Sequence, residues 1–367
     1  MSVFPIRRPH RHRPRRRTAL ILGTVAAAVL ALLAPATAQA AADPSTLSLA
    51  ETTAVGIHNP YGQAAYPYLA DALDAGASLI ELDTWIDPFG NEWKVSHSSP
   101  LGNSNNCVNA SSPADLYTGG ANKDLGSCLD DIRVWFSAHP NHPPIMIKIE
   151  LKEGFDATIG MGPAALDALI KAHLGSMVYR PADLLAKPGG GTYPTLDAAA
   201  QANNWPTRAA LAGKVIIEAI PGTVEQANPF DHLWTDVEYA DYLNTLQAAG
   251  TLGNAEIFPS VLNAQAGDPR TRYTDPSVRP WFVVFDGDAS AYVDGGIDTS
   301  WYDTNHYILI MTDAENVTPT LSDTAPSQAD AQARVIELAA DHASFVSCDW
   351  TGLPSVLGTI TVRGTDS

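Results

Sequence analysis

Short apolar runs rich in β-branched residues recur along the 367-residue chain. Eight of them can be marked, at residues 54–57, 79–82, 93–95, 145–151, 215–220, 281–285, 307–311 and 345–348. Ala/Leu-rich segments with helical spacing separate several runs, at residues 66–74, 164–173 and 329–340. This alternation predicts an α/β fold with a parallel sheet, and eight strands over this length predict a TIM-type (β/α)8 barrel. The second and third runs are too close for an intervening helix, so we expect an irregular barrel. An open doubly wound sheet is the alternative.

The first forty residues have the pattern of a signal peptide. Seven arginines precede an apolar run at residues 19–33, and Ala38-Gln39-Ala40 forms a small-residue cleavage pattern. A membrane anchor is the alternative, but the run is shorter than the roughly 20 residues that a spanning helix needs. We therefore expect secretion through the general or the twin-arginine route, with cleavage near Ala40. Residues 41–367 would then form a single domain without a transmembrane segment.

Loss of the leader would make the protein more acidic. The full chain has 22 Lys and Arg against 40 Asp and Glu, a net charge of −18, and removal of the seven arginines gives −25. This balance argues against nucleic-acid binding, which depends on neutralisation of phosphates by Lys and Arg. Any phosphate chemistry would need local cations, and a bound metal ion is the obvious candidate.

The three cysteines suggest one disulfide in an oxidising compartment. Cys107 and Cys128 flank much of a polar, Gly/Asn/Ser-rich stretch at residues 100–126 that has the composition of a long loop, and they are the expected pair. Cys348 lies in an apolar run and is expected to be a buried thiol.

Residues suited to acid/base and metal chemistry follow the first runs directly. His58 and Asn59 follow the first run, Glu81 and Asp83 end the second, and His97 follows the third. The carboxyl ends of neighbouring parallel strands lie at one edge of a sheet, so we expect these side chains to meet. Glu81 and Asp83 are two apart and share one face of a strand, although such an acidic pair can also be a solvated surface.

Oxygen ligands in this arrangement favour a hard cation. The carboxylates, the amide oxygen of Asn59 and Glu150 at the end of a later run suit Ca²⁺, or alternatively Mg²⁺, rather than zinc. Two histidines beside such a metal suit phosphodiester cleavage, one taking and one giving a proton. Lys152 shares the strand face of Glu150 and is expected to contact a substrate phosphate, the alternative being a surface lysine.

At these residues the chain resembles the phospholipase C-like phosphodiesterase superfamily, and most closely its secreted bacterial, calcium-dependent phosphatidylinositol-specific phospholipases C. The likeness is strongest over residues 56–152. It implies a TIM-type barrel, Ca²⁺ held by Asn59, Glu81, Asp83 and Glu150, and two catalytic histidines, His58 and His97. An inositol hydroxyl would attack the phosphorus, releasing diacylglycerol and a cyclic inositol phosphate. His97 would protonate the leaving group and His58 would act as base or stabilise the transition state, and these two roles can be exchanged.

Polar groups near later strand ends are weaker candidates. They are Glu218, Asp286, Asp288, Asp313 and Asp349, with Trp350 and Tyr302 as rings that could pack on a sugar. Related secreted enzymes carry a basic residue at the end of the seventh strand, where this chain has Asp313. An acidic rim would disfavour multiply phosphorylated inositides and tolerate a neutral polyol or a cationic headgroup such as choline.

Other functions share much of this pattern. Glycerophosphodiester phosphodiesterases and sphingomyelinase D-like phospholipases also use two His and a Glu-x-Asp metal pair. Asn59 favours the phospholipase C branch, since the glycerophosphodiesterases typically have Arg at that position, whereas a loop disulfide after the second His also occurs in the sphingomyelinase D toxins. A non-catalytic protein that binds Ca²⁺ or a lipid headgroup is a further alternative. We expect a monomer that meets a phospholipid or phosphodiester substrate at a membrane surface.

Overall fold

A computed structural model describes residues 42–87 and 89–365. The expected signal peptide, residues 1–40, lies outside the described residues, so the leader and the domain division that depends on it stay predictions. Within the described part of the chain, no helix is long and apolar enough to cross a bilayer.

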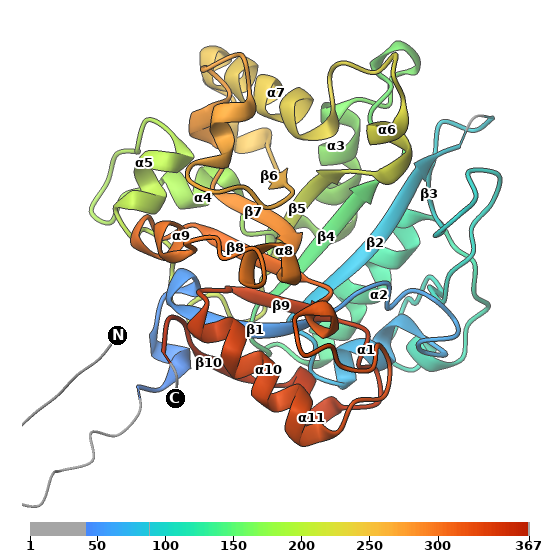
Figure 1. Ribbon diagram of the computed structural model, residues 1–367. Helices are drawn as coiled ribbons and strands as arrows, with labels where there is room; N and C mark the ends of the chain where they lie inside the picture. Colours follow the sequence, from blue (N-terminus) through green and yellow to red (C-terminus); the bar gives the residue numbers. More distant parts are fainter. Residues whose placement is uncertain (1–41, 88, 366–367) are drawn as a thin grey trace, which may run out of the picture. The chain divides into compact units, whose positions relative to one another are not determined.

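Eight parallel strands form a closed barrel at the centre of the fold (Figure 1). They are β1 (Thr52–Ile57), β2 (Leu79–Ile86), β4 (Ile145–Leu151), β5 (Val215–Pro221), β6 (Phe258–Leu262), β7 (Val284–Asp288), β8 (Ile308–Thr312) and β9 (Phe345–Cys348). Strand β1 closes the barrel because it pairs in parallel with both β2 and β9. Gly56 permits this closure, since a Cβ there would lie 2.5 Å from the Cβ of Leu79. The TIM-type barrel is therefore confirmed and the open doubly wound sheet is excluded.

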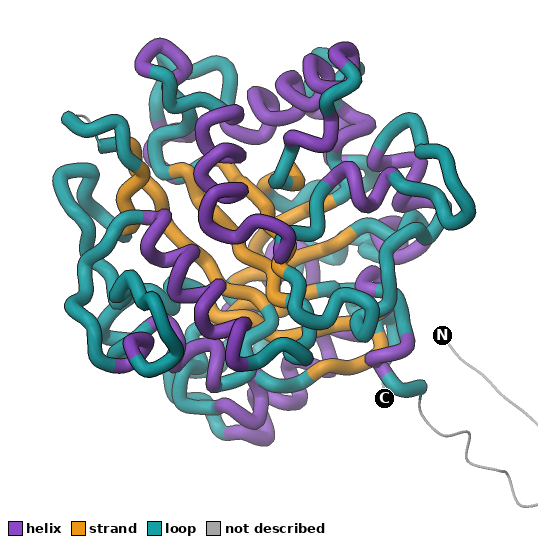
Figure 2. The backbone as a smooth tube through the Cα atoms, turned by 180° about the vertical axis from the view of Figure 1, so that it is seen from behind, coloured by secondary structure: helices purple, strands orange, loops and turns teal. Residues whose placement is uncertain are grey.

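Helices surround the strands, as Figure 2 shows from behind. They are α1 (Leu69–Asp74), α2 (Leu125–Ala138), α3 (Pro163–Leu174), α4 (Pro181–Leu185), α5 (Leu196–Gln201), α6 (Thr223–Ala227), α7 (Thr235–Ala249), α8 (Ala289–Val293), α9 (Ser300–Thr304), α10 (Gln328–Ala340) and α11 (Pro354–Leu357). The three segments expected to be helical correspond to α1, α3 and α10. The expected loop at residues 100–126 ends before residue 126, because α2 already begins at Leu125. Asp124 caps this helix by accepting a hydrogen bond from the Ser127 N–H.

One expected barrel strand has a different role, and one barrel strand was not expected. The run at 93–95 forms β3 (Trp93–Val95), which pairs antiparallel with the end of β2, as Thr84 opposite Val95 shows. This strand is one arm of a hairpin, so it is not a member of the barrel. The missing barrel strand is β6, whose sequence Phe-Pro-Ser-Val-Leu contains a proline that interrupts the strand pattern. A further short strand, β10 (Ile360–Val362), pairs antiparallel with β1.

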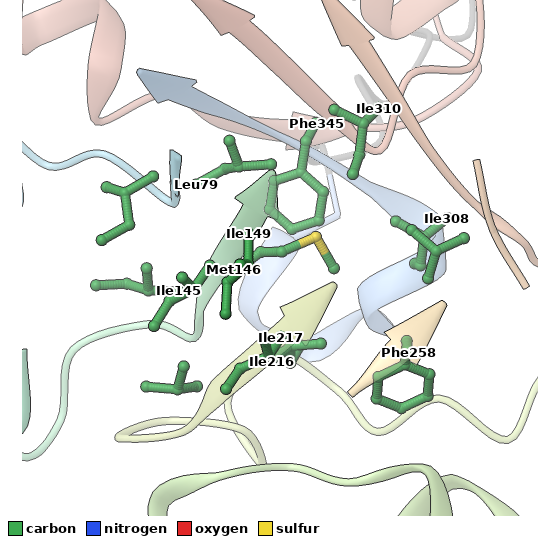
Figure 3. Packing of buried hydrophobic residues seen from close by; sticks show 14 of the residues in the cluster. Leu79, Ile145, Met146, Ile149, Ile216, Ile217, Phe258, Ile308, Ile310 and Phe345 are labelled. Carbon is green, nitrogen blue, oxygen red and sulfur yellow. The ribbon is translucent and has the colours of Figure 1, made fainter. Parts of the chain in front are cut away.

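The barrel interior has an apolar level and an ionic level. Figure 3 shows the apolar level, where buried side chains from different strands pack together, including Leu79, Met146, Ile216, Phe258, Ile308 and Phe345. Two residues further along β4 the side chain is Lys148, whose ammonium lies 2.9 Å from the Asp286 carboxylate. Strands β4 and β7 are not neighbours, so this ion pair crosses the barrel interior. The change from apolar to charged side chains runs toward the carboxyl ends of the strands.

The long loop after β3 is fixed by a disulfide and by buried polar side chains. Cys107 and Cys128 are bonded, and Cys348 is free and buried, so both cysteine predictions are confirmed. The buried Asn106 donates hydrogen bonds to the carbonyls of Pro60 and Tyr66. These bonds attach the loop to the segment that follows β1, and so help to fix the wall beside His58.

Candidate active site

His58 and Asn59 are positioned by the end of β1. The His58 N–H donates to the Cys348 carbonyl at the end of β9, which extends the parallel pairing to the histidine itself. Asn59 has a left-handed backbone conformation, φ 49°, which asparagine tolerates better than most residues. Its amide nitrogen lies 2.9 Å from His58 Nε2, and its amide oxygen is buried without a hydrogen-bond partner.

Three carboxylates converge beside Asn59. Glu81 and Asp83 come from one face of β2 and Glu150 from β4, and one oxygen from each lies within 4.8 Å of the others. The two strands pair in register at this point, Asp83 opposite Glu150. Burial, together with the charges of Glu81 and Glu150, raises the pKa of Asp83 to about 7. A cation among these oxygens would relieve that repulsion.

Two lysines partly neutralise the carboxylates. Lys152 Nζ lies 3.0 Å from Asp83 Oδ2 and 2.9 Å from Glu150 Oε1. Lys148 Nζ lies 3.3 Å from Glu81 Oε1. Lys152 is buried, so the alternative of a surface lysine is wrong. The structure places its ammonium against the expected metal ligands.

His58 is held between two acidic side chains. Its Nδ1 lies 3.1 Å from Asp349 Oδ1, and its Nε2 lies 3.4 Å from Glu81 Oε2. Burial alone would lower the pKa of His58, but the hydrogen bond to Asp349 and the charges of Glu81 and Asp349 outweigh it and raise the pKa to about 9. The imidazole is therefore mostly protonated at neutral pH and can donate a proton.

His97 lies in the same region as His58 but is carried by a different element. It follows the hairpin strand β3 and is exposed. Both His58 and His97 line one cavity of about 810 Å³, together with Tyr61, Gln63 and Asp349. The expectation that the two imidazoles share a mouth is met, although only His58 lies at the end of a barrel strand.

A second cavity of about 340 Å³ also has His58 in its lining. Glu81 and Glu150 line it, as do Asn263, Asp288 and Asp313 from the ends of later barrel strands. Of the weaker candidates, Asp286 is buried but lines this cavity, and Glu218 is fully buried in the barrel. Trp350 and Tyr302 are fully buried, so the expectation that their rings pack on a sugar is wrong.

The chain is similar to known proteins in sequence and in fold. Residues 63–228 match the family described as phosphoinositide phospholipase C, Ca²⁺-dependent. A solved calcium-dependent phosphatidylinositol-specific phospholipase C from Streptomyces antibioticus is 55% identical to the chain, with 87% of this chain and 99% of that one covered and a TM-score of 0.84. The chain belongs to the calcium-dependent phosphatidylinositol-specific phospholipase C family. A calcium-dependent enzyme from Pseudomonas sp., solved with myoinositol, is 19% identical and shares the fold, with 88% and 99% of the two chains covered and a TM-score of 0.64. Comparison with curated proteins gave no match.

Membership of this calcium-dependent phospholipase C family makes the chain a phosphodiesterase of phospholipase C type. The donor set fits the cation that the family requires, because three carboxylates and the unpartnered amide oxygen of Asn59 are hard oxygen ligands within reach of one ion. The family match covers Glu81, Asp83, His97, Glu150 and Lys152, while His58 and Asn59 lie just before its start.

Sequence reasoning missed three residues of the phospholipase C-like site. Lys148 precedes Glu150 by two positions on the same strand, so same-face spacing could have identified it. The Thr223 N–H donates to Glu150 Oε1, at 3.0 Å, from the start of α6. Asn263 was missed because it follows β6, the strand that its proline kept from being predicted. Thr223 was missed because it acts through its backbone N–H, and a backbone donor leaves no signal in a sequence.

Proposed function

We propose that the chain is a secreted, Ca²⁺-dependent phosphodiesterase that cleaves phosphatidylinositol into diacylglycerol and an inositol phosphate. Its metal ligands would be Asn59, Glu81, Asp83 and Glu150. The observation that carries the proposal is the position of His58, which contacts Glu81 and lines both cavities. A phosphate placed beside it can meet the metal ligands on one side and His97 on the other.

The histidines would move the protons of this reaction. An inositol hydroxyl forms a bond to phosphorus, the bond from phosphorus to the diacylglycerol oxygen breaks, and that oxygen takes up a proton. In the calcium-free protein the pKa of His58 is raised to about 9, and its protonated form is suited to stabilise charge on the phosphate or to donate the proton. His97 then accepts the proton of the attacking hydroxyl. Bound Ca²⁺ would draw negative charge from a phosphoryl oxygen.

The second cavity favours an inositol ring without additional phosphates. Five of the described residues that line it are acidic: Glu81, Glu150, Asp286, Asp288 and Asp313. The one lysine among these lining residues, Lys148, is already paired with Glu81 and Asp286. An added phosphate would therefore meet carboxylates without a free ammonium. The hydroxyl groups of inositol can instead donate hydrogen bonds to these carboxylates.

Exposed apolar side chains around the barrel mouth favour contact with a membrane surface. Phe89 lies between β2 and β3, Ile159 follows β4, and Val224, Phe230 and Trp234 follow β5. Phe89 and Phe230 are each 88% exposed. The Asn91 side chain donates to the Ile159 carbonyl, which brings the hairpin beside the segment after β4. Side chains of this kind can enter a lipid interface without help from positive charge.

A product assay tests the proposed reaction. The purified enzyme should release water-soluble inositol phosphate from phosphatidylinositol and not act on lysophosphatidylcholine or glycerophosphoinositol, and EGTA should abolish the activity until Ca²⁺ is restored. His58→Ala and His97→Ala should each lower kcat at least about 100-fold. His173→Ala, on the outer helix α3, is the matched control and should retain activity. Full activity in both site variants would contradict the proposed roles, and Ca²⁺ binding without turnover would favour the non-catalytic alternative.

Vesicle sedimentation tests the membrane contact. Joint Phe230→Ser and Trp234→Ser substitutions should weaken binding to phosphatidylcholine vesicles. Hydrolysis of monomeric short-chain phosphatidylinositol should be unaffected, because neither side chain contacts the metal ligands. Equal vesicle binding by the variant would contradict the role of these residues.

Secretion rests on the leader pattern and is supported by the Cys107–Cys128 disulfide, which is typical of oxidising compartments. Amino-terminal sequencing of protein recovered from culture medium should begin near Ala41. Light scattering of the same sample should give the mass of a monomer. Retention of residues 1–40 in a membrane fraction would contradict the proposed export.

A further inference from the structure

Lys152 occupies the space between two of the proposed calcium ligands. Its ammonium contacts Asp83 Oδ2 at 3.0 Å and Glu150 Oε1 at 2.9 Å, and both carboxylates belong to the cluster of three that converges within 4.8 Å. Only 5% of Lys152 is exposed. A lysine on the protein surface would exchange such contacts with water, whereas this one is held in them.

The backbone of Lys152 is fixed on two sides. Its N–H donates to the Thr84 carbonyl of β2, and its carbonyl accepts from the Glu225 N–H of α6. A Cβ at Gly222 would lie 2.3 Å from the Lys152 Cα, so the next strand end is packed closely against it. Movement of the ammonium therefore needs rotation about side-chain bonds and no change in the barrel.

Calcium and this ammonium compete for the same two carboxylates. Ca²⁺ binds carboxylate oxygens at about 2.3–2.6 Å, so an ion held by Asp83 and Glu150 through either oxygen of each would lie close to the Lys152 nitrogen. Two cations so close repel strongly in a partly buried site. The third carboxylate, Glu81, is not in contact with Lys152 in this way. Lys148 contacts its Oε1, and its Oε2 lies beside His58.

We propose that Lys152 is a resident counter-cation that Ca²⁺ must displace, and that it thereby sets the calcium affinity of the enzyme. This inference rests on the proposed metal ligands. In the calcium-free protein, Lys152 keeps Asp83 and Glu150 together. When Ca²⁺ binds, the ammonium moves away from both carboxylates on its flexible four-carbon chain.

Calorimetric titration of the EGTA-treated protein with Ca²⁺, without substrate, tests the proposal. Lys152→Met should bind Ca²⁺ about 10- to 100-fold more tightly than the unsubstituted protein, because the competing charge is gone. Its melting temperature without Ca²⁺ should fall, because Asp83 and Glu150 then repel each other, and added Ca²⁺ should raise it by more than in the unsubstituted protein. Lys152→Arg keeps the charge and should bind Ca²⁺ more weakly than Lys152→Met.

Lys94→Met is the matched control. Lys94 forms an ion pair with Asp87 at 3.0 Å in the neighbouring hairpin, away from the cluster of three carboxylates, so its loss should leave calcium affinity unchanged. Equal or weaker Ca²⁺ binding by Lys152→Met would overturn the inference and leave the metal site standing. Absence of Ca²⁺ binding in the unsubstituted protein would overturn the metal site and the inference together.

Discussion

The apolar and the ionic level of the barrel interior are built on the same strands, but different interactions stabilise them. On β4, Met146 belongs to the apolar level and Lys148, two residues later, to the ionic level. The apolar level gains free energy from burial of hydrocarbon and close packing. The ionic level contains buried charges, and such charges are tolerated only while each has a partner. The apolar level therefore supports the fold, and the ionic level holds the geometry of the site.

The ionic level surrounds a single ammonium with several carboxyl groups. Lys148 contacts Glu81 at 3.3 Å and Asp286 at 2.9 Å, and the fully buried Glu218 also lies in its field. Burial alone would lower the pKa of Lys148, but the surrounding carboxylates raise it. Lys148 also fixes the position of Glu81. Burial would raise the pKa of Glu81, but the charges of Lys148 and His58 lower it, so this carboxylate stays ionised beside His58.

Removal of Lys148 should have the largest effect on stability. Lys148→Met leaves Glu81 and Asp286 buried without their cation, and loss of one partner of a buried ion pair costs about 3–5 kcal/mol. Urea denaturation at pH 7 would measure this decrease in the free energy of unfolding. A variant as stable as the parent would show that the ionic level can be replaced by apolar packing, and would remove the proposed difference between the levels.

Met146 provides the matched change in the apolar level. Met146→Ala should cost about 2–5 kcal/mol through the lost contacts and the cavity left behind. At a temperature where the variant remains folded, its calcium affinity should equal that of the parent, whereas Lys148→Met should bind Ca²⁺ differently because Glu81 loses its contact. A large change in calcium affinity for Met146→Ala would contradict the division of roles.

Glu218 gives the ionic level a dependence on pH. Burial first, and then the neighbouring charge of Asp286, raise the pKa of Glu218 well above its ordinary value of 4.5. The folded state thus keeps a proton that the unfolded state releases, and this group opposes folding increasingly as the pH rises above about 4.5 toward the folded pKa. Glu218→Gln has no proton to release, so it should match the parent near pH 4 and be more stable than the parent at pH 7. Urea titrations between these pH values would measure the difference, which should grow with pH rather than stay constant.

The convergence of the candidate site residues could largely be predicted from the sequence, because these residues follow strands closely. Glu81, Asp83 and Glu150 lie at positions where strand periodicity alone determines the face, and His58 and Asn59 follow the first strand directly. Lys148 shares the strand face of Glu150, so spacing could have placed it in the site. Its partner Asp286 could not be predicted, because it lies 138 positions away along the printed sequence, across a barrel whose closure no local pattern records. The expected number of eight barrel strands was right, although the run at 93–95 was wrongly included and β6 was omitted. Strand β6 was missed because Pro259 interrupts its sequence pattern. The strand tolerates this proline because it pairs with β5 at few positions. His97 was expected in the right place for a partly wrong reason, because a hairpin and not a barrel strand carries it.

Ile310 tests how independent the two levels are. Ile310 lies opposite Asp286 of β7 and opposite Phe345 of β9 in the sheet, so it lies at the boundary between charged and apolar side chains. Ile310→Val removes one methylene and should cost about 0.5–1.5 kcal/mol in urea denaturation. Its calcium affinity, measured by calorimetry, should remain that of the parent, because the oxygens that face the metal site are held by Lys148, Lys152 and the strand ends rather than by packing. A weaker calcium affinity from so small a change would mean that the apolar packing sets the position of Asp286, and through Lys148 that of Glu81, so that the levels act as one unit.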